Sequence, residues 1–141
     1  MPSIQQGIIA AALMAAFASP VFAEGDPANG EKAFRKCAAC HTATEDGPSR
    51  IGPNLFDIVD RPTAAAEGFA YSDPMAALGE EGHIWSAEEL DKFLEDPKGM
   101  VPGTKMAFPG VKKPEERADL IAYLTSVSPG AGEAEPEAAA E

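Results

Sequence analysis

Cysteine, histidine and tryptophan are scarce in this sequence of 141 residues, which contains two, two and one of them, respectively. Two cysteines exclude a multiply disulfide-bonded scaffold and a zinc site with four cysteine ligands. Positive charge is scarce too, because 11 Lys and Arg stand against 23 Asp and Glu and give a formal net charge of −12. A charge of this sign argues against a nucleic-acid partner, whose phosphates attract basic surfaces. Strand-like alternation and internal repeats are also missing, so the pattern favours an all-α protein.

The main apolar run is too short to be a typical membrane span. It covers residues 8–23, IIAAALMAAFASPVFA, and about 15 apolar residues suit the core of a signal peptide, whereas a transmembrane helix needs about 20. Val21 and Ala23 fit the small-residue rule at a cleavage site, so residues 1–23 are interpreted as a signal peptide, although no Lys or Arg precedes the run. Its removal predicts a periplasmic protein in an oxidising compartment. The alternatives are a buried core helix and an uncleaved N-terminus that anchors the protein to the membrane.

The C-terminal segment, residues 128–141, reads SPGAGEAEPEAAAE and has no aromatic or branched apolar side chain. Such a composition cannot bury enough surface to offset the entropy of ordering, so we expect an acidic disordered tail. A solvated helix over the Ala/Glu run is the alternative, which the two prolines disfavour. Residues 24–127 remain as one domain, of a size at which a hydrophobic core alone stabilises only marginally. A cofactor at the centre would add to that core.

Three helix starts stand out within residues 24–127. Each shows an N-cap residue, a proline at the first helical position or acidic residues in the first turn. The three starts are Asp26 with Pro27, Ser86 through Glu89, and Lys113 through Glu116. We expect the first helix to run into the cysteine motif and Pro97 to end the second. Gly/Pro-rich loops fill residues 42–73 and 97–112. Loops this long in a small domain need an organising element, such as a large planar cofactor.

The two cysteines lie in Cys37-Ala38-Ala39-Cys40-His41. A thioredoxin-like redox pair would need a preceding strand, and a zinc site would need more ligands at set spacing. A structural disulfide is a further alternative. The Cys-x-x-Cys-His pattern is typical of covalent haem c attachment, because one turn brings two thiols to the two vinyl groups of the porphyrin. The next residue, His41, then directs its imidazole at the iron.

The sixth position of such an iron calls for a second ligand. Three methionines follow the expected signal peptide: Met75, Met100 and Met106. Met106 follows a stiff Pro-Gly turn that can fix its approach, so it is the predicted ligand; a thioether favours the reduced iron. Met100 is the direct rival in the same loop. His83 is another alternative and would give a haem with two histidine ligands.

Five segments resemble a known family: GDPANGEKAFRKCAACHT, IGPNL, GFAYS, DPKGMVPGTKM and ERADLIAYL. With them the chain resembles class I c-type cytochromes, and in particular the mitochondrial and short bacterial soluble forms, over residues 25–126. The resemblance implies the all-α cytochrome c fold, with crossing terminal helices around one covalently bound haem c. Residues 24–127 would then be the cytochrome c domain. The terminal helices would cross where Gly30 and Phe34 meet Leu120 and Tyr123.

The resemblance also assigns roles around the haem. It implies that the carbonyl of Pro53 accepts a hydrogen bond from Nδ1 of His41, which fixes the ring and raises its basicity. Four further side chains would hold the haem propionates: Arg61, Tyr71, Trp85 and Thr104. Taken alone, Tyr71 and Trp85 are equally well core aromatics with polar tips. The sequence departs from the family at Phe93, where a tyrosine usually faces the methionine sulfur.

The function that the resemblance implies is one-electron transport by a monohaem protein that is not an enzyme. A monomer would exchange electrons with membrane redox complexes, such as a bc1-type complex, a terminal oxidase or a reaction centre. The alternatives are a peroxidase-like haem enzyme and a gas-binding haem protein, and both need an open sixth site.

Basic residues are concentrated on segments expected to frame the haem edge. Seven of the 11 lie there: Lys32, Arg35, Lys36, Lys98, Lys105, Lys112 and Lys113. Local charge dominates within a Debye length of about 8 Å, so a lysine-rich face can dock on an acidic partner despite the net charge. The alternative is that these side chains are ordinary solvated residues, offset by Glu31, Glu95 and Asp96.

Overall fold

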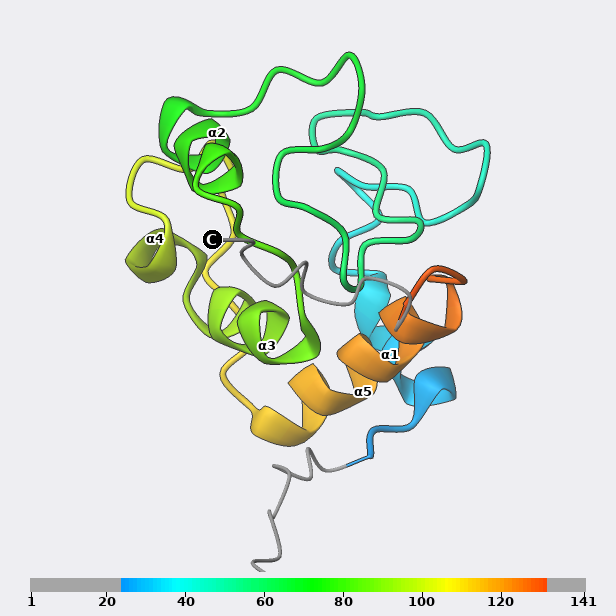
Figure 1. Ribbon diagram of the computed structural model, residues 1–141. Coiled ribbons are helices and arrows are strands. Elements are labelled where there is room, and N and C mark those ends of the chain that lie inside the picture. The colour runs from blue at the N-terminus through cyan, green and yellow to red at the C-terminus, as the bar shows by residue number, and fades with distance from the viewer. Residues whose placement is uncertain (1–23, 132–141) are drawn as a thin grey trace, which may run out of the picture.

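The computed structural model describes residues 24–131 and contains helices joined by long loops, without a sheet in that range (Figure 1). The helices are α1 (Pro27–Phe34), α2 (Asp73–Glu80), α3 (Ala87–Glu95), α4 (Pro97–Met100) and α5 (Pro114–Ser126). A single isolated antiparallel bridge joins Pro62 and Ile84 within the described residues. The expected all-α class is therefore confirmed. The expected signal peptide, residues 1–23, lies outside the described residues, as do residues 132–141 of the expected tail.

The first and last helices cross, as Figure 1 shows. Asp26 caps α1 by accepting a hydrogen bond from Ala28 N at 2.8 Å, and its own backbone N–H donates to Asp119 Oδ1 of α5 at 2.7 Å. At Gly30 the two backbones come so close that a Cβ atom would lie 1.9 Å from the carbonyl oxygen of Asp119. Glycine at this position therefore permits the crossing, which holds one wall of the site in place.

The middle of the chain has two short helices that the sequence pattern did not indicate. Ser86 caps α3 as predicted, accepting from Glu89 N at 3.2 Å. Pro97 follows the end of α3 but also begins α4, because Asp96 accepts a hydrogen bond from Gly99 N at 3.1 Å. Helix α2 has no fully buried residue, and only Met75 and Leu78 pack against the core, which is too short an apolar pattern to indicate a helix.

Two predicted boundaries differ from the structure. Helix α1 ends at Phe34, and the cysteine motif follows in consecutive turns instead of a continuous helix. The expected tail begins at Ser128, yet Ser128 is buried and its Oγ accepts a hydrogen bond from Val59 N at 3.1 Å. Gly130 N also donates to Asp57 Oδ1 at 2.8 Å. The packed chain thus extends to residue 131. No helix in residues 24–131 is long and apolar enough to cross a membrane.

Candidate functional site

A cavity of about 280 Å³ lies at the centre of the molecule, between the crossed helices, α3 and the loops. It is lined by all of the residues predicted to bind a haem and its iron: Cys37, Cys40, His41, Pro53, Arg61, Tyr71, Trp85, Thr104 and Met106. These residues come from six separate stretches of chain. Most other lining side chains are apolar, and many belong to the hydrophobic core: Phe34, Ile58, Leu90, Phe93, Leu94, Leu120 and Leu124.

The cysteine motif is held in a tight turn. Cys37 N donates to Phe34 O at 2.7 Å and His41 N donates to Cys37 O at 2.9 Å, so both thiols and the imidazole reach one cavity. Cys37 and Cys40 do not form a disulfide with each other. Burial raises the pKa of Cys37 to about 11, partly opposed by Lys36. A redox-active pair needs a thiolate at neutral pH, so this environment argues against the thioredoxin-like interpretation.

A zinc site at the same motif is also disfavoured. No group of three or more His, Cys, Asp or Glu side chains that could hold a metal ion exists among residues 24–131. Structural zinc takes four such ligands.

His41 is oriented by a hydrogen bond from its ring to the backbone of Pro53. Its Nδ1 lies 2.7 Å from the carbonyl oxygen of Pro53, and because a carbonyl only accepts, Nδ1 carries the proton and donates. The lone pair of Nε2 is then left for a metal. Burial lowers the pKa of His41, and the hydrogen bond to Pro53 opposes that effect. A lowered pKa keeps the imidazole neutral, which is the form that binds iron.

Gly52 is a functional residue that sequence reasoning missed. A Cβ atom at Gly52 would lie 2.3 Å from Cε1 and 2.7 Å from Nδ1 of His41. The ring therefore packs directly on the backbone of Gly52, which leaves no room for a side chain. The sequence signal was the Gly-Pro pair in IGPNL, in which the proline was assigned a role and the glycine was not.

Two methionines line the cavity, Met106 and Met75, whereas Met100 is not among the described residues that line it. Met106 lies in a loop whose turn contains Gly103, with φ 87°. Lys105 fastens this loop by donating from Nζ to the carbonyl oxygen of Ala70 at 3.1 Å. Met75 lies between Tyr71 and Trp85, in a stretch that is slightly longer than in the mitochondrial proteins, so the family resemblance assigned it no role.

The polar end of the cavity supplies hydrogen-bond donors for an acidic ligand. Arg61 donates from Nη1 to Phe56 O at 3.0 Å and from Nη2 to Asn54 O at 3.1 Å, while its Nε is buried and has no hydrogen-bond partner within residues 24–131. The hydroxyl of Tyr71 accepts from Ala66 N at 3.0 Å, so its proton can be donated elsewhere. No Asp or Glu among the described residues lines the cavity. An unsatisfied guanidinium N–H in a site without acids fits the carboxylate-bearing edge of a haem.

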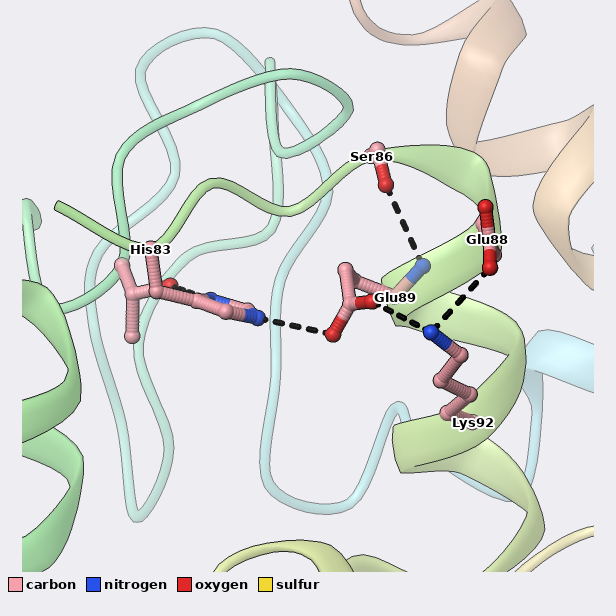
Figure 2. A network of polar contacts seen from close by, with 6 residues as sticks. His83, Ser86, Glu88, Glu89 and Lys92 are labelled. Atoms are coloured by element: carbon pink, nitrogen blue, oxygen red, sulfur yellow. Dashed lines mark hydrogen bonds and ion pairs between the residues drawn. The ribbon is translucent and has the colours of Figure 1, made fainter.

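His83 lies elsewhere, in a polar network beside α3 (Figure 2). Its Nδ1 is 2.6 Å from Thr63 Oγ1 and its Nε2 is 3.0 Å from Glu89 Oε2. With both ring nitrogens engaged, and with the ring absent from the described lining of the cavity, His83 is not placed to be the sixth ligand.

These features match a known group of proteins. The family model described as Cytochrome c matches residues 27–128. The chain belongs to the cytochrome c family. Cytochrome c2 of Agrobacterium tumefaciens (strain II Chrys) is 46% identical over 101 residues, which are 72% of this chain and 91% of that protein. Cytochrome c2 of Rhodomicrobium vannielii is 39% identical over 126 residues, which are 89% of this chain and 97% of that protein. The solved structure of cytochrome c2 from Rhodospirillum centenum has a TM-score of 0.71 at 37% identity and covers 74% of this chain and 100% of its own.

Membership of this family establishes the cofactor and the general function. The cytochrome carries one covalently attached haem c at the Cys37 and Cys40 pair and acts as a one-electron carrier. The expectation of a cytochrome c fold is confirmed by the family match and by the similarity to the solved cytochrome c2.

Proposed function

We propose that this cytochrome shuttles electrons in the periplasm with His41 and Met106 as axial ligands of its haem iron. The haem supplies an iron that gains and loses one electron. The protein supplies the ligands, a dry apolar cavity and donors for the propionates, which we assign to Arg61, Tyr71, Trp85 and Thr104. The observation that carries the proposal is the convergence of His41, with its Nε2 left open, and Met106 on one cavity.

An axial methionine also argues against the enzyme and gas-binding alternatives. Both need an open sixth site and, for a peroxidase, a polar group beside it. Here the described cavity has no Asp or Glu, and its one histidine is held at Nδ1 by Pro53. We therefore favour electron transport over these two alternatives.

The ligand assignment is tested by replacing each methionine separately. We expect Met106→Ala to abolish the weak red absorption band of a methionine–iron(III) bond and to give a high-spin, or a lysine- or water-ligated, haem. Met100→Ala and Met75→Ala are matched controls that should keep the band. Loss of the band in either control, with retention in Met106→Ala, would show that the assignment is wrong.

We further propose that the partners are membrane redox complexes, of the bc1, terminal-oxidase or reaction-centre type, and that they dock at the rim of the cavity. Lys36 and Lys105 line the cavity, and the neighbouring Ile51 has 79% of its surface exposed. Exposed apolar area beside basic side chains suits an acidic partner with an apolar centre. Lys36 forms an ion pair with Glu116, which reduces the positive charge expected on this face.

Salt dependence tests the docking proposal. If the basic rim governs approach, electron transfer with the anionic reagent ferricyanide slows as salt rises, and transfer with a cationic reagent speeds up. Slopes of the opposite sign for both reagents would mean that the net charge of −12 governs encounter. A positively charged partner would then be indicated.

The periplasmic location is also part of the proposal, because the segment that carries it, residues 1–23, is not described structurally. Cleavage after Ala23 predicts that the protein recovered from a periplasmic fraction begins at Glu24. Mass spectrometry of the purified holoprotein tests this. An intact N-terminus in the membrane fraction would instead support the anchored alternative.

A further inference from the structure

His83 occupies a two-sided polar site that the electron-transfer proposal does not use. Thr63 Oγ1 lies 2.6 Å from its Nδ1. On the other side of the ring, Glu89 Oε2 lies 3.0 Å from its Nε2 (Figure 2). The side chain is 15% exposed, so solvent protons can reach it although its contacts are fixed.

The site is separated from the haem cavity by one aromatic ring. The His83 ring packs edge-on against Trp85, with centroids 4.9 Å apart and an interplanar angle of 83°. Trp85 lines the cavity and packs in turn on Phe93 at 4.9 Å. The backbones are tied as well, since Thr63 N donates to His83 O at 2.9 Å and Trp85 N donates to Arg61 O at 2.9 Å.

The geometry accommodates both protonation states of the imidazole. The carboxylate of Glu89 can only accept, so Nε2 carries a proton and donates to it in either state. In the neutral ring, Nδ1 accepts from the hydroxyl of Thr63. In the protonated ring, Nδ1 donates, and the Thr63 hydroxyl needs only to rotate in order to accept. A proton can therefore bind and leave without a change in packing.

The surrounding charges also support proton binding at this site. On α3, Glu89 faces the ring directly and is bound in turn by Lys92 at 2.6 Å; Lys92 also pairs with Glu88 at 3.1 Å. The hydrogen bonds from Lys92 and His83 lower the pKa of Glu89, which keeps it anionic. On the other side, the segment with Thr63 also carries Arg61. At the end of α2, Glu80 and Glu81 are exposed.

We propose that His83 is a redox-linked proton-binding site. When the haem takes up one electron from a donor, its charge falls by one, and neutral His83 binds one proton from water to become imidazolium. On oxidation the electron goes to the acceptor and the proton returns to water. The inference rests on the haem-carrying function but not on the identity of the sixth ligand.

The coupling has a fixed sign. A positive charge next to Trp85 favours the reduced haem, so the reduction potential is higher when His83 is protonated. By linkage, His83 holds its proton to a higher pH in the reduced protein than in the oxidised protein. Histidine is the side chain that ordinarily changes charge between pH 5 and 8, so this is the range in which the coupling is to be measured.

The direct test is proton NMR of the intact holoprotein, titrated with pH in the reduced and in the oxidised state. Because the sequence has only two histidines and His41 is the proposed iron ligand, the titrating imidazole resonance is readily assigned to His83. We expect two titration midpoints, with the reduced protein titrating at the higher pH. Equal midpoints in the two states would overturn the proposal.

The second test is the reduction potential of three proteins measured from pH 5 to 8. In the wild type we expect the potential to fall with rising pH between two bends. His83→Gln should remove the bends, and Glu89→Gln should move them to lower pH, because the imidazolium loses its carboxylate. Bends unchanged in His83→Gln would assign them to another group, such as a propionate, and overturn the proposal. A reversible one-electron potential at any single pH tests the carrier function separately.

Discussion

The contact between Gly52 and His41 makes Gly52→Ala a sensitive probe of the proposed ligand. The added Cβ would lie 2.3 Å from Cε1 of the ring, whereas carbon atoms in contact prefer about 3.5 Å. The ring, or the backbone below it, must therefore move by about 1 Å. Gly52 does not have a positive φ, so its backbone conformation is open to alanine. If the ring were absent, the substitution would stabilise the protein by about 0.4–1 kcal/mol, because alanine lowers the conformational entropy of the unfolded chain.

The expected cost is larger than that gain. Overpacking a well-filled site costs about 1–3 kcal/mol. Moving the ring also weakens the 2.7 Å hydrogen bond between His41 Nδ1 and Pro53 O, and a typical hydrogen bond contributes about 1 kcal/mol. We therefore expect the free energy of unfolding to fall by about 2–3 kcal/mol. The absorption and NMR spectra should report a displaced axial imidazole.

Guanidinium unfolding of the holoprotein, together with its absorption spectrum, tests this expectation. Gly47→Ala is the control, because its Cβ would meet hydroxyl oxygens of Thr44 and Thr42 at 2.6 and 2.7 Å and not the imidazole. Whatever its effect on stability, the control should leave the haem spectrum unchanged. If Gly52→Ala has wild-type or higher stability and an unaltered spectrum, His41 does not pack on Gly52 in solution.

Three further substitutions have defined outcomes. Gly30→Ala should lower Tm in thermal unfolding, because a Cβ 1.9 Å from Asp119 O forces the helices apart, which outweighs a gain of about 1 kcal/mol in helix propensity; a higher Tm would contradict the close crossing. Phe93→Tyr should raise the reduction potential by ~40 mV if its hydroxyl donates about 1 kcal/mol of hydrogen bond to the sulfur of Met106; an unchanged potential in voltammetry would show that residue 93 does not face the sulfur. The pKa of Glu89 lies below its ordinary value of 4.5, so Glu89→Gln should lower the free energy of unfolding near neutral pH. The difference between the two proteins should vanish as pH falls through that lowered pKa, which unfolding curves at each pH would measure.

Local signals predicted the helices that begin with a strong cap. The side chains of Asp26 and Ser86 accept the predicted backbone hydrogen bonds, because capping depends on a few neighbouring residues. The family resemblance added the residues around the cavity, which lie far apart in the sequence. Helices α2 and α4 escaped prediction because the first has only two core-facing side chains, both partly buried, and the second is only four residues long.

The unpredicted parts of the site all depend on contacts between distant segments. The close approach of Gly52 to His41 and the position of Met75 at the cavity follow from how the loops fold over one another. The network of His83 likewise joins three segments, residues 60–63, 83–85 and α3, and no spacing in the sequence brings Thr63 to Glu89. Ser128 was assigned to a tail on composition, although its hydroxyl and backbone are used in the fold.

The hydrophobic core and the cofactor site are built from the same side chains, and this couples folding to haem attachment. Phe34, Leu90 and Leu120 are buried core residues that also line the cavity. At about 24 cal/mol per Å³, leaving a cavity of 280 Å³ unfilled would cost about 7 kcal/mol. Small domains have a total stability of about 5–15 kcal/mol, so this loss would be comparable to the whole margin. The haem is therefore part of the core, and the cysteine turn after α1 is placed where it fixes that core to the crossing of the terminal helices.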